Sequence, residues 1–395
     1  MKTHACRYCG SVTKKILDLG VMPLVNYFPT EKEKDVVKKY PLTLQYCRVC
    51  KLGQTGVIVR PANIFPRYQY VTGTSVPLVS HLSGLADMVS KKYLSKTAAV
   101  LDIGCNDGTL LSFFAKRGHR VLGVDPAKSV RSEKAVETVP VIVDFFSKKI
   151  AKKILQDYGQ FQCITLTHTL ANIPNLQDFM DGITVLLAPQ GRLVIEVASF
   201  EDMMQNGQID AVYHEHYYYF SEYFLVKMLQ DFGLCVERIM RDSPQGGSTI
   251  IIATAGSVKV KPTVRQVSTA MVFRIAKFAK RYRTQLRKVI RSYKGRHVVG
   301  LGAPAKAVTL LNWAGLSRGD IQYVVDSTPQ KQGRYIPSVD IPVYPESYIV
   351  GKPVDAVILL AWNYRDEMLK KFRTVLSKNV CIIAPFPRLY VQKGR

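Results

Sequence analysis

The sequence predicts an α/β protein in which a small N-terminal metal-binding module precedes two Rossmann-like domains. Three observations support this prediction. Two CxxC pairs occur near the N-terminus. Short apolar runs then alternate with amphipathic stretches in two series, which begin at Ala98 and at His297. Such runs are typical of parallel strands that are buried on both faces. A long helical pattern separates the two series.

The boundaries between these parts follow the changes of pattern. A chain of 395 residues is long enough for two or three domains. The expected segments are a metal-binding module at 1–60, a connector or lid at 61–95, a central cofactor-binding domain at 96–258, a long basic helix at 259–296 and a C-terminal Rossmann-like domain at 297–395.

The composition is that of a folded globular protein, with 47% hydrophobic and 22% charged residues. The N-terminus carries no apolar signal region, and no apolar stretch reaches the ~18 residues that a membrane span needs. We expect a cytoplasmic monomer without a membrane span. The formal charge of +25 would attract polyanions such as nucleic acid, anionic lipid or phosphorylated metabolites, but it does not choose among them.

Much of this charge lies in one segment, from Arg265 to Arg296, which holds eleven Arg and Lys residues and no acid. Apolar residues recur there at helical spacing, namely Val267, Met271, Ile275, Phe278, Tyr282, Leu286 and Ile290. We interpret the segment as one long amphipathic helix that bridges two domains with a solvated basic face. Contact of this face with a membrane surface or with RNA is an open alternative.

Four cysteines near the N-terminus, Cys6, Cys9, Cys47 and Cys50, form two CxxC turns. Four thiolates in this pattern typically bind zinc tetrahedrally, and the segment between them has too little apolar material for a core of its own. Disulfides and a redox CxxC are the alternatives. A cytosolic location disfavours the first, and the absence of a flanking βαβ unit disfavours the second. We therefore predict a structural Zn2+ with no open coordination position.

The central domain begins with VLDIGCNDGTLL, which predicts a strand, a tight glycine turn and a helix start. The strand RVLGVD ends about twenty residues later in Asp125, where an acid can bind both ribose hydroxyls. The next strand end offers an acid and two aromatic residues to an adenine. Because the first strand ends in an acid and G-x-G-x-x-G is absent, the pattern favours S-adenosylmethionine. The candidate cofactor-binding residues are Asp102, Gly104, Asn106, Asp107, Asp125, Asp144, Phe145 and Phe146.

A second loop, GLGAPA, does match G-x-G-x-x-A after a strand, and Asp326 closes the following strand. A nicotinamide-dependent enzyme is therefore a second possibility. Glycines in such loops also serve helix–strand packing, and one cofactor loop is already present in the central domain. We favour a repeated fold that binds no NAD.

The segment YHEHYYYFS, from Tyr213 to Ser221, has the highest density of proton-transfer groups in the chain. A neutral His can remove a proton near pH 7, a Tyr can donate to a developing oxyanion, and a Glu can fix a His tautomer. The two His and the Glu could instead be metal ligands or a polar turn. Because HEH lacks the HExxH spacing of a helical zinc site, we favour a catalytic role.

Taken together, these motifs resemble those of the sugar C-methyltransferase family, whose members methylate carbon 3 of nucleotide-linked 4-keto deoxysugars. The resemblance covers nearly the whole chain: the paired CxxC module, the YQY segment, LDIGCNDGTLL, YHEHYYYFS, QGGS, GAPAKAVTLLNW and VDSTPQKQGRYIPSVDIPVY. It implies a zinc-binding front segment, a central methyltransferase domain that binds S-adenosylmethionine, and a related C-terminal domain without nicotinamide.

The resemblance also implies roles for individual residues. His216 resembles the family's base, Tyr213 and Glu215 resemble its supporting groups, and Tyr70 resembles an aromatic donor on the lid. The expected chemistry is proton abstraction at carbon 3 by His216, followed by attack of that carbon on the sulfonium methyl.

Two positions depart from the family pattern. The chain has HTLANIP where the family commonly has an N-T-L-x-H-I-P pattern, so that the His and Asn are exchanged between His168 and Asn172. Gln245 stands where the family has a His. His168 lies four residues before Asn172 and could face the same pocket from a helical turn, so both are candidate catalytic residues.

Two other functions compete with sugar C-methylation. O- or N-methylation of a related sugar or small molecule needs no carbon acid. A zinc-containing RNA-binding protein or RNA methyltransferase would use the zinc module and the basic helix, but that helix lacks interleaved aromatic base-stacking motifs. We expect a nucleotide-linked sugar substrate and no nucleic-acid partner.

Overall fold

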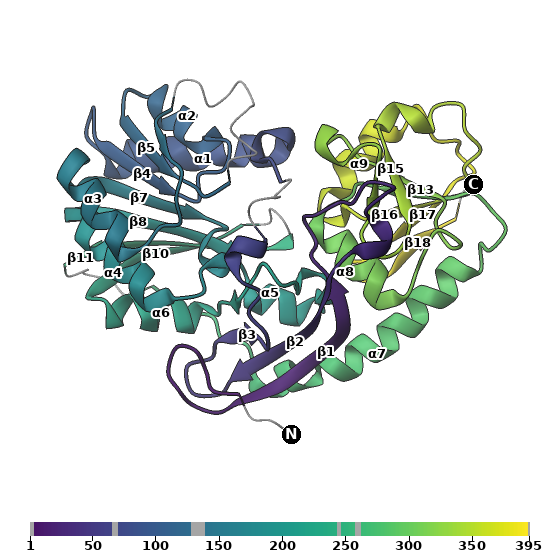
Figure 1. Ribbon diagram of the computed structural model, residues 1–395, viewed down its shortest axis with the longest axis horizontal. Coiled ribbons are helices and arrows are strands. Elements are labelled where there is room, and N and C mark those ends of the chain that lie inside the picture. The colour runs from purple at the N-terminus through teal and green to yellow at the C-terminus, as the bar shows by residue number, and fades with distance from the viewer. Residues whose placement is uncertain (1–3, 65–69, 128–138, 243–245, 257–261, 394–395) are drawn as a thin grey trace.

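The structure is a computed structural model that describes residues 4–64, 70–127, 139–242, 246–256 and 262–393. Two α/β lobes lie side by side, and a smaller N-terminal sheet and one long helix pass beneath them (Figure 1). The departure from the family pattern at Gln245 lies outside the described residues.

The N-terminal sheet is antiparallel and has the order β1-β2-β3-β9. Its strands are β1 (Thr13–Pro23), β2 (Lys39–Cys47), β3 (Gly53–Thr55) and β9 (Tyr218–Tyr219). The last strand comes from the YHEHYYYFS segment of the central lobe. The metal-binding module is therefore paired directly with the segment that carries the candidate acid–base groups.

The central lobe is built on a seven-stranded sheet of order β10-β11-β8-β7-β4-β5-β6. The strands are β4 (Ala99–Ile103), β5 (Arg120–Val124), β6 (Val141–Ile142), β7 (Phe161–Thr167), β8 (Leu187–Ala198), β10 (Leu234–Asp242) and β11 (Ser248–Ala255). Strands β4 to β8 pair in parallel, and β10 and β11 are antiparallel. The chain runs outward from β4 to β5 and β6 and then returns to β7 on the other side. This reversal opens a crevice at the carboxyl end of β4, where ligands of such sheets bind.

Helices connect and cover the strands of the central sheet. They are α1 (Val76–Tyr93), α2 (Thr109–Ala115), α3 (Lys148–Tyr158), α4 (Leu176–Leu186), α5 (Phe200–Gln205) and α6 (Glu222–Asp231). Side chains of Ser147, Asn175, Ser199 and Ser221 cap α3, α4, α5 and α6 by accepting a backbone N–H of the first turn.

The C-terminal lobe repeats this plan with a sheet of order β14-β15-β13-β12-β16-β17-β18. Its strands are β12 (Val298–Leu301), β13 (Tyr323–Val325), β14 (Arg334–Ile336), β15 (Ile341–Tyr344), β16 (Ala356–Leu359), β17 (Cys381–Ala384) and β18 (Tyr390–Gln392). The helices α8 (Ala305–Ala314) and α9 (Arg365–Phe372) belong to this lobe. Here the strand order reverses at β12. The expected α/β fold with two Rossmann-like sheets is thus confirmed.

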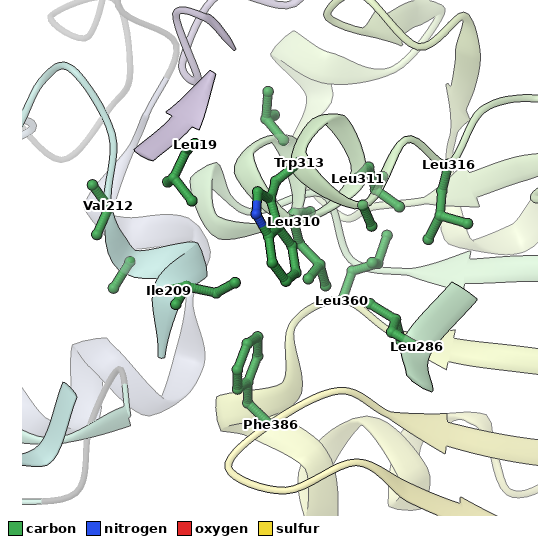
Figure 2. Packing of buried hydrophobic residues seen from close by; sticks show 14 of the residues in the cluster. Leu19, Ile209, Val212, Leu286, Leu310, Leu311, Trp313, Leu316, Leu360 and Phe386 are labelled. Atoms are coloured by element: carbon green, nitrogen blue, oxygen red, sulfur yellow. The ribbon is translucent and has the colours of Figure 1, made fainter. Parts of the chain in front are cut away.

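The long helix α7 (Thr269–Arg291) links the lobes through a shared apolar core. Figure 2 shows Leu19 of β1, Ile209 of the central lobe, Leu286 of α7 and Trp313 of α8 packed together. The buried stripe of α7 includes Val272 and Ala279, whereas Met271 and Phe278 are exposed. No helix in the described ranges has the length and apolarity that crossing a membrane requires.

Candidate active site

A cavity of about 750 Å³ lies where the two strand-order reversals face each other. All three parts of the chain contribute to its wall. The N-terminal module contributes Asn26, the central lobe contributes the turns after β4, β5, β6 and β7, and the C-terminal lobe contributes the loops after β12 and β13. This volume is typical of a small-molecule site. The cavity is therefore placed to hold a ligand of the central lobe and a ligand of the C-terminal lobe at once.

The loop after β4 has the tight geometry that the sequence predicts. Gly104 has a φ of 78°, and a Cβ there would lie 2.1 Å from Oγ1 of Thr169. Glycine is therefore required at this position. Asp102 is buried beside the loop, where the hydroxyl of Thr165 donates to Oδ1 at 2.7 Å. Burial raises the pKa of Asp102 to about 7.

Asp125, at the end of β5, holds this loop from the other side. Its Oδ2 accepts a hydrogen bond from the Asn106 N–H at 2.9 Å, and its Oδ1 accepts one from the Ala127 N–H at 2.8 Å. The carboxylate lies in the cavity wall at the carboxyl edge of the sheet. Asp144, Phe145 and Phe146, the other candidates for contact with the adenosine, also line the cavity after β6.

Asp107 differs from the other candidate cofactor residues because it does not line the cavity. Its Oδ1 accepts from the N–H and hydroxyl of Thr109 at 3.1 and 2.7 Å, at the start of α2. Its Oδ2 accepts from the Gly73 N–H at 2.7 Å. Asp107 therefore ties both the start of α2 and the segment around Gly73 to the cofactor loop.

The lid segment is fixed to the cofactor loop mainly by Asn106. The N–H and hydroxyl of Thr72 donate to Oδ1 of Asn106 at 2.9 and 3.1 Å, and Nδ2 of Asn106 donates to the carbonyl of Tyr70 at 3.0 Å. Tyr70 itself lines the cavity, and burial raises the pKa of its hydroxyl. The lid residue and the cofactor loop are thus held together in the wall.

His216 and Tyr213 are brought together in the cavity wall. Oη of Tyr213 lies 3.0 Å from Nε2 of His216, a hydrogen-bond distance, and the two ring centroids are 4.1 Å apart. Burial lowers the pKa of His216 to about 3, and the charges of His168 and Lys306 act in the same direction. The imidazole is therefore neutral at pH 7 and keeps a lone pair that can accept a proton.

Glu215 lies outside this arrangement, in contrast to the expected supporting role. Its Oε1 accepts hydrogen bonds from the N–H groups of Val25 and Asn26 at 3.1 and 3.3 Å, and it does not line the cavity. Nε2 of His214 lies 3.2 Å from the carbonyl oxygen of Tyr40. The reason is local geometry, because His214 and Glu215 form a turn that the His216 N–H closes by donating to the Tyr213 carbonyl at 3.2 Å. Glu215 and His214 thus hold the N-terminal segment, and HEH does not form a ligand cluster.

His168 and Asn172, the two residues exchanged relative to the family pattern, both line the cavity. His168 follows β7 and has a φ of 54°, while Asn172 ends a short 3-10 helix (Leu170–Asn172). Oδ1 of Asn172 is buried and has no hydrogen-bond partner among the described residues. Both positions of the departure therefore present polar groups to the same ligand space.

The GLGAPA loop of the C-terminal lobe repeats the carboxylate arrangement of the central loop. Oδ2 of Asp326 accepts from the Ala303 N–H at 2.6 Å, and Oδ1 accepts from the Thr328 N–H at 2.8 Å. Nζ of Lys331 donates to the Ala303 carbonyl at 2.9 Å. This loop faces the same cavity as the cofactor loop.

The sequence prediction missed two charged residues, Lys306 in the cavity wall and Glu196 behind it, 3.4 Å from His168. Lys306 lies in the first turn of α8 and lines the cavity, with Nζ 4.7 Å from the centre of the Trp362 ring. Glu196 is fully buried in β8. The sequence does hold a signal for Glu196, because an acid inside the apolar run LVIEVA predicts a buried carboxylate, and a buried carboxylate requires polar or charged partners.

The four cysteines of the N-terminal module converge as expected. Their Sγ atoms all lie within 4.8 Å of one another, with 3.6 Å between Cys6 and Cys50 and between Cys9 and Cys47. Four thiolates at this spacing fit a tetrahedral zinc ion and leave no position for a substrate. The zinc of this protein is therefore structural, and Cys6, Cys9, Cys47 and Cys50 are the side chains that can hold it.

Comparison with known proteins matches each part of the chain to a described domain. Residues 6–65 match a zinc binding domain, residues 82–239 a methyltransferase domain, and residues 245–387 the C-methyltransferase C-terminal domain. The fold neighbours include magnesium protoporphyrin IX methyltransferase (ChlM) from Synechocystis PCC 6803 with bound SAH. The match to ChlM has 17% identity and a TM-score of 0.37, over 51% of this chain and 89% of that one.

Two curated relatives differ in how much of the chain they cover. A ubiquinone biosynthesis O-methyltransferase from Xylella fastidiosa is 27% identical over 111 residues, which are 28% of this chain and 45% of that protein. The C-methyltransferase NovU from Streptomyces niveus is 30% identical over 402 residues, which span 97% of this chain and 95% of NovU. With three matching domains and this full-length similarity, the chain belongs to the family of zinc-binding, S-adenosylmethionine-dependent C-methyltransferases.

Proposed function

We propose that the protein methylates carbon 3 of a nucleotide-linked 4-keto deoxysugar, with His216 as the base. The observation that carries this proposal is the pair of His216 and Tyr213 in the wall of a cavity shared by two Rossmann-like lobes. Methylation of oxygen or nitrogen needs no carbon acid. A neutral imidazole beside a hydroxyl suits removal of a proton from carbon.

The charges of the cavity wall support a nucleotide-linked substrate. The lysines that line the described wall are Lys306, Lys331 and Lys371, and all three belong to the C-terminal lobe. Lys306 lies in the first turn of α8, where backbone N–H groups and the helix dipole favour an anion. Phosphates bound there would leave the sugar between the lobes, next to His216.

In the proposed reaction, His216 takes the proton from carbon 3 and the electron pair moves to the 4-keto oxygen. S-adenosylmethionine supplies an electrophilic methyl group on its sulfonium. Asn172 lies in the wall with an amide that can donate to the enolate oxygen, His168 also lines the wall, and Tyr213 and Tyr70 contribute hydroxyls. The negative enolate stabilises the protonated His216 that forms in the same step. General-base catalysis of this kind contributes about 10²–10⁴-fold to the rate.

The test is the variant His216→Asn, measured with a panel of nucleotide-linked 4-keto sugars. We expect unchanged affinity for S-adenosylmethionine and a fall in turnover of about 10²–10⁴-fold. Exchange of the carbon 3 proton with solvent deuterium, followed with S-adenosylhomocysteine in place of the methyl donor, should fall equally. Exchange at the wild-type rate in this variant would refute the base assignment. A methyl group found on oxygen or nitrogen would refute C-methylation.

A further inference from the structure

A chain of ionisable side chains leads from the surface of the central lobe to the cavity. Oε2 of Glu196, in β8, lies 2.9 Å from Nε2 of His81 on α1, and Oε1 of Glu196 lies 3.4 Å from Nε2 of His168. Nδ1 of His81 lies 3.3 Å from Oδ2 of Asp242 on β10. Only His168 of these four residues lines the cavity.

The buried carboxylate of Glu196 explains why two imidazoles converge on it. The side chain of Glu196 is 0% exposed, so an ionised carboxylate there needs charged or hydrogen-bonding partners. Burial alone would raise the pKa of Glu196, but His168 and His81 outweigh it and hold that pKa at about 2. Glu196 also raises the pKa of His81, which Asp242 reinforces. The negative charge of Glu196 thus lies 3.4 Å from Nε2 of His168.

The backbone of His168 is tied to the same residue. The His168 N–H donates to the Glu196 carbonyl at 2.8 Å, and the φ of 54° places His168 in the left-handed region. This conformation costs a residue with a Cβ about 1–3 kcal/mol, so it persists where surrounding contacts fix it. The main chain and the side chain of Glu196 together set the direction of the His168 ring.

This arrangement also decides which ring nitrogen of His168 can meet a ligand. Nε2 of His168 and Oε1 of Glu196 are both buried and lie 3.4 Å apart, and no residue in the described part of the chain makes a hydrogen bond to either atom. The carboxylate therefore favours the tautomer with hydrogen on Nε2. The nitrogen left for the cavity is Nδ1.

We propose that Glu196, supported by His81, is a positioning residue that fixes the tautomer and orientation of His168, so that Nδ1 faces the substrate as a hydrogen-bond acceptor. The part of this proposal that concerns the substrate rests on the function proposed above. Glu196 does not need to accept the proton itself. It stabilises the positive charge that develops on His168 when Nδ1 accepts a hydrogen bond or a proton from the substrate.

A direct measurement on the unmodified, zinc-loaded protein tests the tautomer. Two-bond ¹H–¹⁵N spectra of protein labelled with ¹⁵N-histidine distinguish hydrogen on Nε2 from hydrogen on Nδ1, and His168→Asn identifies the signal. We expect the Nε2–H pattern for His168. The Nδ1–H pattern would overturn the proposal. This result does not depend on the substrate, so it separates the inference from the proposed reaction.

The variant Glu196→Gln tests the consequence for catalysis, because the amide can accept a hydrogen bond from only one of the two imidazoles at a time. We expect kcat to fall about 10–1000-fold while KM and the affinity for S-adenosylmethionine stay unchanged. The matched control is Glu237→Gln, on β10, where Oε2 of Glu237 pairs with Nε of Arg192 at 2.9 Å outside the cavity wall. This control should keep the wild-type kcat.

A double-mutant cycle separates positioning from a general effect on folding. If Glu196 acts through His168, then Glu196→Gln combined with His168→Asn should lose little more kcat than His168→Asn alone. Additive losses would overturn the proposal. If Glu196→Gln does not fold, His81→Gln keeps a donor to Glu196 and should preserve the His168 tautomer. A changed tautomer would refute Glu196 as its determinant, and failure of the wild-type protein to exchange the carbon 3 proton would refute only the proposed reaction.

Discussion

Replacing Asp125 by Ala should weaken binding of S-adenosylmethionine without unfolding the central lobe. The substitution removes the two hydrogen bonds, of 2.9 and 2.8 Å, by which the carboxylate holds the N–H groups of Asn106 and Ala127. It also removes the acceptor that we assign to the ribose hydroxyls. Hydrogen bonds to a charged group contribute about 1.5–3 kcal/mol each, of which part is recovered by water. We expect a net loss of about 1–3 kcal/mol, or roughly 5- to 150-fold in Kd.

The C-terminal lobe offers a matched control for this experiment. Asp326 holds the backbone N–H groups of Ala303 and Thr328 in the same way, at 2.6 and 2.8 Å. Asp326→Ala should therefore perturb its loop to a similar degree but leave the affinity for S-adenosylmethionine unchanged. Titration calorimetry gives both affinities, and thermal melting shows whether each variant is folded. An unchanged Kd for Asp125→Ala, or an equal loss in both variants, would show that the cofactor site is misplaced.

Two further variants test the zinc module and the exchanged histidine. Cys47→Ser removes one of the four thiolates, so elemental analysis should fall from one zinc per chain to well under half and the melting temperature should drop. Binding of S-adenosylmethionine by the central lobe should persist, and full zinc content in this variant would exclude Cys47 as a ligand. His168→Asn should lower turnover by about 10–10³-fold with little change in stability, if His168 contacts the reacting part of the substrate. Unchanged turnover would limit its role to the pairing with Glu196.

The fold could be read from the sequence because each element carried a local pattern. Buried strands appeared as short apolar runs, and the glycine turns before α2 and α8 marked the two strand-order reversals. The buried stripe of α7 was less well predicted. A period of 3.6 residues brings Val272 and Ala279 to the core, and Phe278 instead covers Gly207, where a Cβ would lie 2.1 Å from the ring.

The candidate site was harder to predict because it depends on which side chains turn inward. His216 and Tyr213 lie three residues apart and meet in the cavity, whereas Glu215 between them turns to the backbone of Val25. Nothing in the sequence around Glu215 distinguishes the two outcomes. Glu196 lies distant in sequence from His81, and only the assembled sheet brings them together. Contacts of this long-range kind have no local signature.

The two lobes have similar sheets and the same carboxylate-held loop, yet their cavity walls differ in charge. The central lobe contributes Asp102, Asp125, Asp144 and Asp178 and no lysine or arginine within the described ranges. Such a wall suits a cationic sulfonium with ribose hydroxyls, because the carboxylates stabilise the positive charge and accept hydrogen bonds. The C-terminal lobe instead contributes three lysines beside Asp326, Glu346 and Glu367. Lys371 pairs with Glu346 at 2.5 Å, and Nζ of Lys331 donates to the Ala303 carbonyl at 2.9 Å. Lys306 lies in the first turn of α8, where the helix dipole also favours an anionic group. This difference supports a division in which one lobe binds the methyl donor and the other binds the phosphates of the acceptor, with His216 between them.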